Sequence, residues 1–271
     1  MPEGPEILFF STFFKKKFLT TTVSNIKSNT EETINVPLDL KGEIVDVCSK
    51  GKLLWIKMTS DTVDKYYYMH IHLGISGWML FKDPKYFVKY EFKLTTKNKK
   101  EHMVYLEDKV RLSKLQIYDE NEHNTILKKM GVEIFKSEFT LEKFKTVIKK
   151  RNMILASFLL KQEIFCGIGN YIKNEVLYMG NLDINIKTGE LKEEQITELY
   201  KNILFVAYSC LIEQLRNSDI ENCLGQEYKI NTPVNIEVPY KYRIYGRTTT
   251  DDGKKVKKVK VGGRDTYTVE E

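Results

Sequence analysis

Cysteine is scarce in this sequence and is nowhere arranged as a metal site or a disulfide framework requires. The four cysteines, Cys48, Cys166, Cys210 and Cys223, are scattered along 271 residues, and no CxxC pair occurs. Zinc sites are built from closely spaced cysteines and histidines. The pattern therefore excludes a zinc site and favours buried or free thiols in a reducing compartment.

Long apolar runs are also absent. No run approaches the roughly 18 residues that a membrane-spanning helix needs, so no membrane partner is expected. A signal peptide has basic residues before its apolar stretch. The apolar stretch 7–14 has the opposite order, because Glu3 and Glu6 precede it and the basic stretch 15–17 follows it. It also lacks a small-residue cleavage site. We expect an intracellular protein without a secretion signal, in the nucleus or the cytoplasm.

Charge of one sign is not in large excess. Lys and Arg number 43 against 37 Asp and Glu, which gives a formal net charge of +6. This balance permits a polyanionic partner, and an ordinary basic surface explains it equally well. With 42% hydrophobic and 30% charged residues, the composition is that of a globular protein with one large domain or two of ordinary size.

Hydrophobic periodicity indicates a helix at the chain start and strands after it. Pro5 suits a first helical position, and Ile7, Phe10 and Phe14 follow at i, i+3 and i+7. From 20 to 118 the apolar runs are short, β-branched or aromatic, and separated by turn residues, which predicts a sandwich or a barrel. The clearest predicted strands are 42–48, 52–58, 66–72 and 90–94.

Helical periodicity returns near Thr140, which can cap a helix that has Glu142 in its first turn. Further helices are predicted over 153–160, 170–179 and 192–216. Strands are predicted again from 240 to 271, where Asp252-Gly253 and Gly262-Gly263 are turn signals and valines alternate with lysines. The chain is thus expected to end in a basic β hairpin.

The chain start can supply a nucleophile. A small second residue such as Pro2 allows the initiator methionine to be removed, which leaves a secondary amine. An α-amino group titrates near about 8, against about 10.4 for lysine, so more of it is neutral at pH 7. Its attack on a sugar carbon would give an iminium ion, and Glu3 could shuttle protons. Proline at position 2 is otherwise common and leads only into a helix.

Three short motifs stand out in the first half: Met-Pro-Glu-Gly-Pro-Glu at 1–6, Ser-Lys-Gly-Lys-Leu-Leu at 49–54 and His-Leu-Gly-Ile-Ser-Gly at 72–77. They resemble motifs of the formamidopyrimidine-DNA glycosylase and endonuclease VIII (Fpg/Nei) family. Met-Pro-Glu-Gly-Pro-Glu resembles the family's N-terminal signature. Ser-Lys-Gly-Lys-Leu-Leu at 49–54 looks like the hairpin with an essential lysine, which assigns that role to Lys52. His72-Leu-Gly-Ile-Ser-Gly77 is similar to His-Leu-Gly-Met-Ser-Gly, with Ile75 in place of the methionine that fills the space left by an extruded base.

Two motifs in the second half extend the resemblance. The stretch 165–175, with Gly-Ile-Gly-Asn, resembles a helix–two-turn–helix, whose helix start would point N–H groups and the Asn170 amide at a phosphate. The segment 242–247, which contains Tyr245, resembles the approach to a zinc finger. Because no cysteine follows Cys223, the hairpin after this segment looks like the zincless finger of the endonuclease VIII-like branch, with Arg264 as the finger arginine that pairs with phosphates.

One loop departs from the family pattern. Asp-Lys-Val-Arg-Leu-Ser at 108–113 stands where the family has Asp-Pro-Arg-Arg-Phe-Gly. By resemblance, Arg111 would contact the orphaned base, and Leu112 would replace phenylalanine as the apolar wedge. An arginine–leucine pair in a strand would otherwise be structural.

The resemblance implies an α+β fold with three parts. These are an N-terminal helix with a two-layered β-sandwich over 1–133, a helical domain with a helix–two-turn–helix over 134–222, and a pocket loop with a zincless β-hairpin finger over 223–271. The implied activity is that of a bifunctional DNA glycosylase and abasic-site lyase of base excision repair. It would flip out oxidised bases, pyrimidines and hydantoins ahead of 8-oxoguanine, and use a Schiff base at Pro2 and β,δ-elimination.

The resemblance also implies the roles of individual residues. The catalytic residues would be Pro2, Glu3 and Lys52, supported by Glu6. The DNA-binding residues would be His72, Asn170, Tyr245 and Arg264. The residues that enter the vacated stack would be Ile75, Arg111 and Leu112. No metal and no organic cofactor are expected. The expected partner of this monomer is damaged DNA, double-stranded or single-stranded.

Two other functions fit part of the pattern. A catalytically inactive module that binds damaged DNA would explain the helix–two-turn–helix and the basic hairpin, but not the presence of Pro2, Glu3 and Lys52 together. It would shift DNA in gels without cutting it. A structural protein independent of nucleic acid would show no salt-dependent affinity for DNA.

Overall fold

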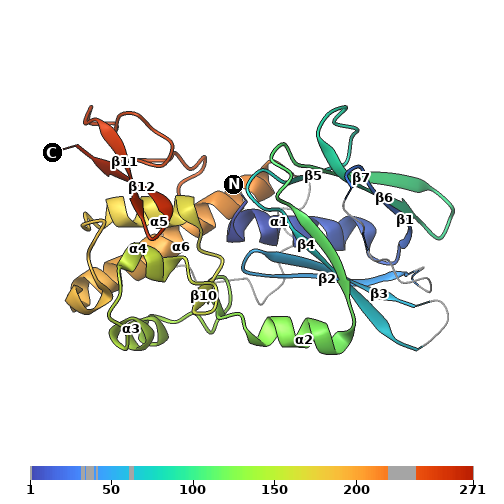
Figure 1. Ribbon diagram of the computed structural model, residues 1–271, viewed down its shortest axis with the longest axis horizontal. Helices are drawn as coiled ribbons and strands as arrows, with labels where there is room; N and C mark the ends of the chain where they lie inside the picture. The colour runs from blue at the N-terminus through green and yellow to red at the C-terminus, as the bar shows by residue number, and fades with distance from the viewer. Residues whose placement is uncertain are drawn as a thin grey trace. The chain divides into compact units, whose positions relative to one another are not determined.

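The computed structural model describes residues 2–31, 34, 40, 42–60, 64–218 and 236–270. The chain divides into two compact units, one of Met1–Pro2 with Glu6–Lys129 and one of Glu3–Pro5 with Met130–Glu271. The ribbon in Figure 1 shows the elements of both. The division at 133 and 222 stays a prediction. Cys223 and most of the predicted pocket loop (222–239) lie outside the described residues.

The first unit contains an N-terminal helix and two antiparallel sheets, which the sequence predicts, and a second helix, which it does not (Figure 1). One sheet has the strand order β1-β6-β7-β5 and the other β2-β3-β4-β8. The bounds are α1 Gly4–Phe18, β1 Thr22–Ser28, β2 Ile44–Lys50, β3 Leu53–Thr59, β4 Tyr66–His72, β5 Trp78–Leu80, β6 Val88–Thr95, β7 Glu101–Glu107 and β8 Lys114–Tyr118. The helix and the four clearest predicted strands are therefore confirmed, with ends that differ by a few residues.

Helix α1 is held in the first unit by its aromatic face. The Phe10 ring lies edge-on to Trp78 of β5, with 4.8 Å between centroids. Phe14 and Phe18 both contact Phe81, the residue after β5. Each such buried side chain contributes about 1.5–3 kcal/mol of stability. The basic last turn of the helix is exposed, so the amphipathic pattern of the sequence describes the helix correctly.

A second helix in this unit is absent from the sequence-based prediction. Helix α2 spans Glu120–Lys128, directly after β8. Asp119 caps it by accepting from the Glu122 backbone N–H, and the Glu122 side chain accepts from the Asp119 N–H in return. This capping box is a sequence signal, because an N-cap residue is followed three positions later by glutamate. Its apolar face is too short to produce a clear period.

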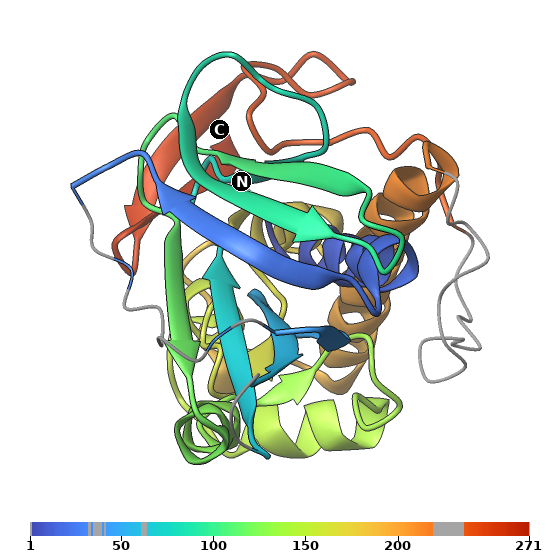
Figure 2. The same cartoon turned by 90° about the vertical axis from the view of Figure 1, so that its right-hand side faces the viewer.

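The described residues of the second unit form four α-helices and a C-terminal hairpin. Its elements are β9 Val132–Glu133, α3 Leu141–Lys149, α4 Leu155–Leu159, β10 Phe165–Cys166, α5 Asn170–Met179, the 3₁₀ turn η1 Thr188–Glu190, α6 Glu193–Arg216, β11 Val256–Val261 and β12 Arg264–Val269. Figure 2 shows the long α6 in orange and the hairpin in red. Thr140 caps α3, as predicted. Among the described residues, no helix is both long and apolar enough to cross a membrane.

The predicted return of strands at 240 is wrong for its first half. The segment 240–255 forms turns and irregular structure, and regular pairing begins only at Val256. The reason is a tertiary contact, because the buried Glu175 carboxylate accepts hydrogen bonds from the backbone N–H groups of residues 243–245, which a strand partner would otherwise bind. The hairpin itself is confirmed: Gly262 and Gly263 both have positive φ, 58° and 77°, as a two-residue type I′ turn requires.

Two histidines are buried side by side in the first unit. His70 Nε2 and His123 Nδ1 share a hydrogen bond of 2.8 Å, and the Tyr68 ring stacks on His123 with 4.0 Å between centroids. His70 is fully buried, and its Nδ1 has no hydrogen-bond partner. Desolvation, followed by the nearby His123 and His72, lowers the pKa of His70 to about 3.

This pair predicts a loss of stability in mild acid. An unfolded histidine takes up a proton near pH 6.5, whereas folded His70 does not until about pH 3. The stabilising effect is therefore complete above pH 6.5 and is lost as the pH falls toward 3, by about 2 kcal/mol at pH 5 for one histidine. Urea unfolding of wild type and of His70→Phe between pH 7 and 4.5 measures this slope.

The expected slope is shallower in His70→Phe, because the substituted side chain cannot titrate. His102→Gln, on β7, controls for the loss of a histidine as such and should keep the wild-type slope. Equal slopes in wild type and His70→Phe would show that the buried pair does not set the acid sensitivity.

Candidate active site and nucleic-acid interface

Glu3 lies in the second unit, at the start of α5. Its side chain is fully buried. Oε1 accepts a hydrogen bond of 2.7 Å from the backbone N–H of Tyr171, and Oε2 accepts one of 3.3 Å from Ile172. The positive end of a helix favours a carboxylate. The side chain proposed for proton transfer is thus held rigidly by the helix–two-turn–helix.

This arrangement corrects one prediction from the sequence. The N–H groups at the start of α5 were expected to face a phosphate, but two of them bind Glu3 instead. The glycines before the helix serve that contact. Gly167 has a φ of +109° and accepts a hydrogen bond of 2.9 Å from the Gly4 N–H. A Cβ on Gly169 would overlap the Glu3 carboxyl group. The turn therefore fixes the chain start.

Asn170 belongs to a polar cluster between α5 and the hairpin. Its Oδ1 accepts from Lys173 Nζ at 2.9 Å, and the same ammonium donates to Asp265 O at 3.0 Å and to Thr266 Oγ1 at 2.9 Å. Asn174 adds a second link, because its Oδ1 accepts from the Tyr267 backbone N–H at 2.8 Å. Lys173, Asn174 and Thr266 are all buried. The hairpin is therefore fixed to the first turns of α5.

Tyr245 is placed by a buried carboxylate. Glu175 on α5 is fully buried and accepts four hydrogen bonds from the segment 240–245. These come from the Tyr240 hydroxyl and from the backbone N–H groups of Arg243, Ile244 and Tyr245, at 2.7, 2.8, 3.0 and 2.8 Å. Burial of a carboxylate is tolerated only with such partners.

The electrostatic surroundings of Tyr245 link it to the other predicted residues of this unit. Desolvation, and then the charge of Glu3, raise the pKa of the Tyr245 phenol, while a hydrogen bond with Asn170 acts in the opposite direction. Arg264 is exposed and is the first residue of β12, next to the type I′ turn. Glu3, Asn170, Tyr245 and Arg264 therefore belong to one region of the second unit, with Lys173 at its centre.

The predicted residues of the first unit lie at one end of a sheet. Lys52 is the second residue of the two-residue turn between β2 and β3, after Gly51 with its φ of +58°. In the neighbouring pair Leu54 is opposite Ile71, so β4 ends beside this turn at His72. His72 in turn pairs with Lys114, the first residue of β8. The half-buried Lys52 and the loops after His72 and before Lys114 thus share one edge.

Those two loops contact each other. Gly74 has a φ of +62°, and a Cβ there would meet the Leu112 backbone at 2.8 Å. Ile75 and Leu112 are 43% and 50% exposed, which is unusual for large apolar side chains and typical of an interaction surface. Arg111, also exposed, has a φ of +59°, a left-handed conformation that costs energy without glycine.

Buried charges hold the wedge loop, residues 108–113, in shape. The Asp108 carboxylate is fully buried and accepts from the Ser76 hydroxyl and from the backbone N–H groups of Val110 and Ser113. Lys89, also buried, donates to the carbonyl groups of Arg111 and Ser113. The backbone is thus fixed at both ends of the loop, and its apolar and basic side chains are turned to solvent.

His72 and Glu6 complete the predicted set. His72 is exposed, and desolvation, followed by the charge of Lys114, lowers its pKa. His72 is therefore neutral near pH 7 and can act as a hydrogen-bond donor. Glu6 is buried in the first turn of α1. Pro2 is buried as well.

Several residues of these regions were not found from the sequence. Lys173, Asn174 and Glu175 look like ordinary helix positions, because their partners are distant in the chain. Tyr86 and Phe87 are 71% and 51% exposed. Phe87 O accepts from the Asp108 N–H, and Lys109 Nζ lies 5.8 Å from the centroid of the Phe87 ring, so this ring adjoins the wedge loop. A signal was available for this pair, since an Asp-Pro-Lys turn precedes them at 83–85.

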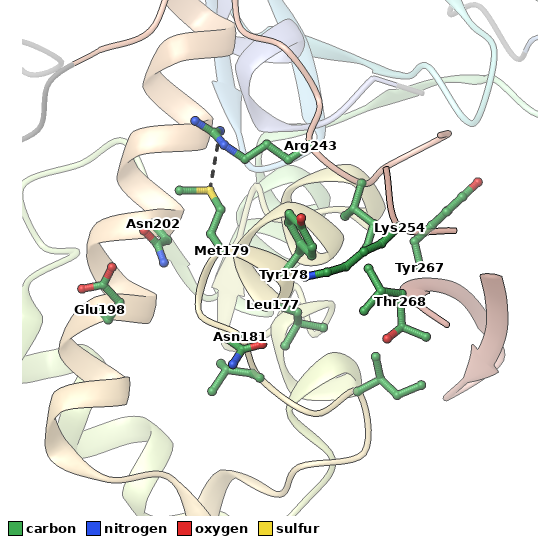
Figure 3. A pocket seen from close by; sticks show the side chains of 14 residues that line it. Leu177, Tyr178, Met179, Asn181, Glu198, Asn202, Arg243, Lys254, Tyr267 and Thr268 are labelled. Atoms are coloured by element: carbon green, nitrogen blue, oxygen red, sulfur yellow. Dashed lines mark hydrogen bonds between the residues drawn. The ribbon is translucent and has the colours of Figure 1, made fainter. Parts of the chain in front are cut away.

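A pocket of about 490 Å³ lies at the other end of α5 and contains none of the predicted site residues. Figure 3 shows Glu198 and Asn202 of α6 on one side and Tyr267 and Thr268 of β12 on the other. Within the pocket, the Arg243 guanidinium donates a hydrogen bond of 3.8 Å to the Met179 sulfur. Among the described residues, no group of three or more His, Cys, Asp or Glu side chains could hold a metal ion.

Comparisons with protein families match most of the chain. The formamidopyrimidine-DNA glycosylase N-terminal domain matches residues 1–115, and the formamidopyrimidine-DNA glycosylase H2TH domain matches residues 130–215. A formamidopyrimidine-DNA glycosylase of Carboxydothermus hydrogenoformans is 27% identical over 75% of this chain and 74% of the relative. That of Listeria monocytogenes is 24% identical over 83% of this chain and 80% of the relative.

Solved structures share the fold at low identity. The Lactococcus lactis formamidopyrimidine-DNA glycosylase, non-covalently bound to DNA containing an abasic site, aligns with a TM-score of 0.74 over 99% of this chain and 98% of its own, at 17% identity. The MutM (Fpg) protein of Thermus thermophilus aligns with a TM-score of 0.75 over 98% and 96% of the two chains, at 20% identity. The predicted α+β fold is confirmed.

Proposed function

The chain belongs to the formamidopyrimidine-DNA glycosylase family, and we propose that it excises oxidised bases and cuts the abasic site through a Schiff base at Pro2. It is a DNA glycosylase of base excision repair. The observation that carries the finer proposal is the burial of Glu3 against the start of α5, next to Pro2 in the chain. The contact fixes the carboxylate of the residue that follows the Pro2 nucleophile, and proton transfer requires a group held in this way.

The proposed reaction proceeds at the sugar C1′. The lone pair of the Pro2 nitrogen forms a bond to C1′, and the base leaves with the electrons of the glycosidic bond and takes up a proton. Glu3 moves the proton of the Pro2 nitrogen to O4′, so that the C1′–O4′ bond opens and an iminium ion forms. Loss of a C2′ proton expels the 3′ phosphate, a second elimination expels the 5′ phosphate, and water releases the amine.

Phosphate binding is assigned to residues of both units. In the second unit we propose Asn170, Tyr245 and Arg264, which lie in one polar region. In the first unit we propose Lys52 and His72, which lie at one edge of a sheet. The lysine would also act in catalysis, with Glu6 in support. Solved relatives bound to DNA with an abasic site and to DNA with an oxidised pyrimidine support damaged DNA as the partner.

Ile75, Arg111 and Leu112 are proposed to enter the stack that the flipped nucleotide leaves. Their support is exposure on two touching loops whose backbones are held by buried charges. Unstacking costs a few kcal/mol and is least for a damaged base that pairs poorly, which contributes to selectivity. An apolar side chain that fills the gap lowers that cost.

Oxidised pyrimidines and hydantoins are proposed as substrates ahead of 8-oxoguanine. The support is the hairpin β11–β12, which has the finger arginine but neither cysteine nor histidine in residues 256–269, as in the zincless endonuclease VIII-like branch. The catalytically inactive DNA-binding module is the second candidate. It is disfavoured because it does not explain the presence of Pro2, Glu3 and Lys52 together.

Borohydride trapping on a panel of oligonucleotides tests the proposal. The mature chain should form a covalent adduct with DNA containing an oxidised pyrimidine or a hydantoin, single- and double-stranded, and less with 8-oxoguanine. The mass of the intact adduct should show loss of methionine and one oligonucleotide, whole or cleaved, bonded through the C1′ of one sugar. Binding to the same oligonucleotides without adduct or strand scission would identify the inactive module instead.

A further inference from the structure

Lys173 is a charged residue in an unfavourable position. It is fully buried and lies in the first turn of α5, where the helix dipole repels a cation. All three of its N–H donors are used, by Asn170 Oδ1, Asp265 O and Thr266 Oγ1, at 2.9, 3.0 and 2.9 Å. An ammonium with three acceptors has no proton left for DNA, so any effect of Lys173 on DNA must act through these partners.

The contact with Asn170 selects one orientation of an amide. An ammonium group can only donate, so the Asn170 side chain must turn its oxygen toward Lys173. The amide nitrogen then faces away from the ammonium. One of its two N–H groups is used by the hydrogen bond with the Tyr245 phenol, and the other can donate to a phosphate oxygen. The other two contacts fix Asp265 and Thr266, which follow Arg264 directly in β12. A single ammonium thus links Asn170 and the strand that carries Arg264, which are two of the three phosphate ligands proposed in the second unit.

We infer that Lys173 is a positioning residue for lesion-DNA binding, which orients the Asn170 amide and anchors the hairpin that carries Arg264. The inference rests on the proposed function and deepens it. Glu3 and Asp265 face the ammonium with negative charge and Arg264 with positive charge. Desolvation, partly opposed by Glu3 and Asp265, lowers the pKa of Lys173 to about 8. The positioning effect should therefore weaken above pH 8, when the group becomes neutral.

A double-substitution cycle tests this inference on the full chain. The probe is a duplex with a tetrahydrofuran abasic analogue, and fluorescence anisotropy at fixed salt measures its Kd. Lys173→Met should weaken binding about tenfold, as expected for loss of a charge-assisted hydrogen bond. Because Lys173 acts through Asn170, Lys173→Met should cost much less in an Asn170→Ala background. Lys201→Met, at an exposed lysine of α6, controls for loss of one charge and should bind like wild type.

A pH series separates positioning from a general effect on folding. Wild-type affinity should fall between pH 7 and 9, while Lys173→Met binds weakly with no such fall. Should Lys173→Met fail to melt cooperatively, Thr266→Val removes one acceptor with little change in shape, and it should weaken binding in the same direction. Losses that multiply in the cycle, parallel pH profiles, or full affinity in the valine variant would each overturn the inference. A wild type that does not bind the probe would overturn the proposed function as well.

Discussion

A single glycine inserted before Pro2 is expected to lower borohydride trapping at least about 10³-fold, as removal of one member of a catalytic unit does. The insertion turns the Pro2 nitrogen into an amide and moves the free amine by about 3.8 Å. Misplacement of a reacting group by only ~1 Å can cost 10²-fold. Single-turnover trapping on abasic DNA measures the loss. Pro2→Gly, which keeps an amine in place, should fall between this variant and wild type.

The matched control carries the same glycine at the other end of the chain. It should trap DNA at the wild-type rate, because the chain start is unchanged. Binding to an uncleavable abasic analogue should be equal in both variants, which separates chemistry from affinity. Full trapping by the chain with the inserted N-terminal glycine would exclude Pro2 as the nucleophile and direct attention to a lysine.

Local signals predicted the elements of this fold well. Helix α5 begins and ends at the predicted residues, Asn170 and Met179, because a glycine turn and an apolar period mark it. The hairpin turn at Gly262-Gly263 was found for a similar reason, since only glycine adopts both of its backbone conformations at low cost. Such signals lie within a few residues of the structure that they specify.

Features that depend on contacts between distant parts of the chain could not be predicted from the sequence. Glu3 and Tyr171 are 168 residues apart in the chain, so no local pattern shows that the glutamate binds this helix start. The segment from 240 was predicted as strand from its aromatic residues, but Glu175 takes its N–H groups instead. Lys173 escaped notice for the same reason, because two of its acceptors belong to a hairpin more than 90 residues away.

The motifs assigned to function from the sequence therefore also have a structural role. Gly-Ile-Gly-Asn was interpreted as a phosphate-binding turn, and Asn170 keeps that proposed role. The two glycines make room for the chain start, Gly167 by its positive φ and its contact with Gly4, and Gly169 by its missing side chain. The N-terminal signature and the helix–two-turn–helix signature thus describe two halves of one contact.

Gly169→Ala follows directly from this contact and should separate catalysis from binding. The added methyl group would overlap the Glu3 carboxyl group, whose oxygens would leave the N–H groups of Tyr171 and Ile172. Gly169 has a φ of −129°, which alanine also adopts, so the substitution causes no backbone strain. We expect a loss of about 10²-fold in single-turnover base excision, from displacement of a positioned group by ~1 Å, with lesion-DNA affinity retained.

Two further variants show whether the effect passes through Glu3. Gly189→Ala makes the same chemical change in the same unit, where the nearest atom to the new Cβ is at 3.4 Å, and it should behave like wild type. Glu3→Gln can still accept from the helix N–H groups but cannot carry a proton as a carboxylate does. Since both changes disable one group, the double variant should be no slower than Glu3→Gln alone. Rates that multiply, or wild-type excision by Gly169→Ala, would show that the carboxylate need not sit at the start of α5 for catalysis.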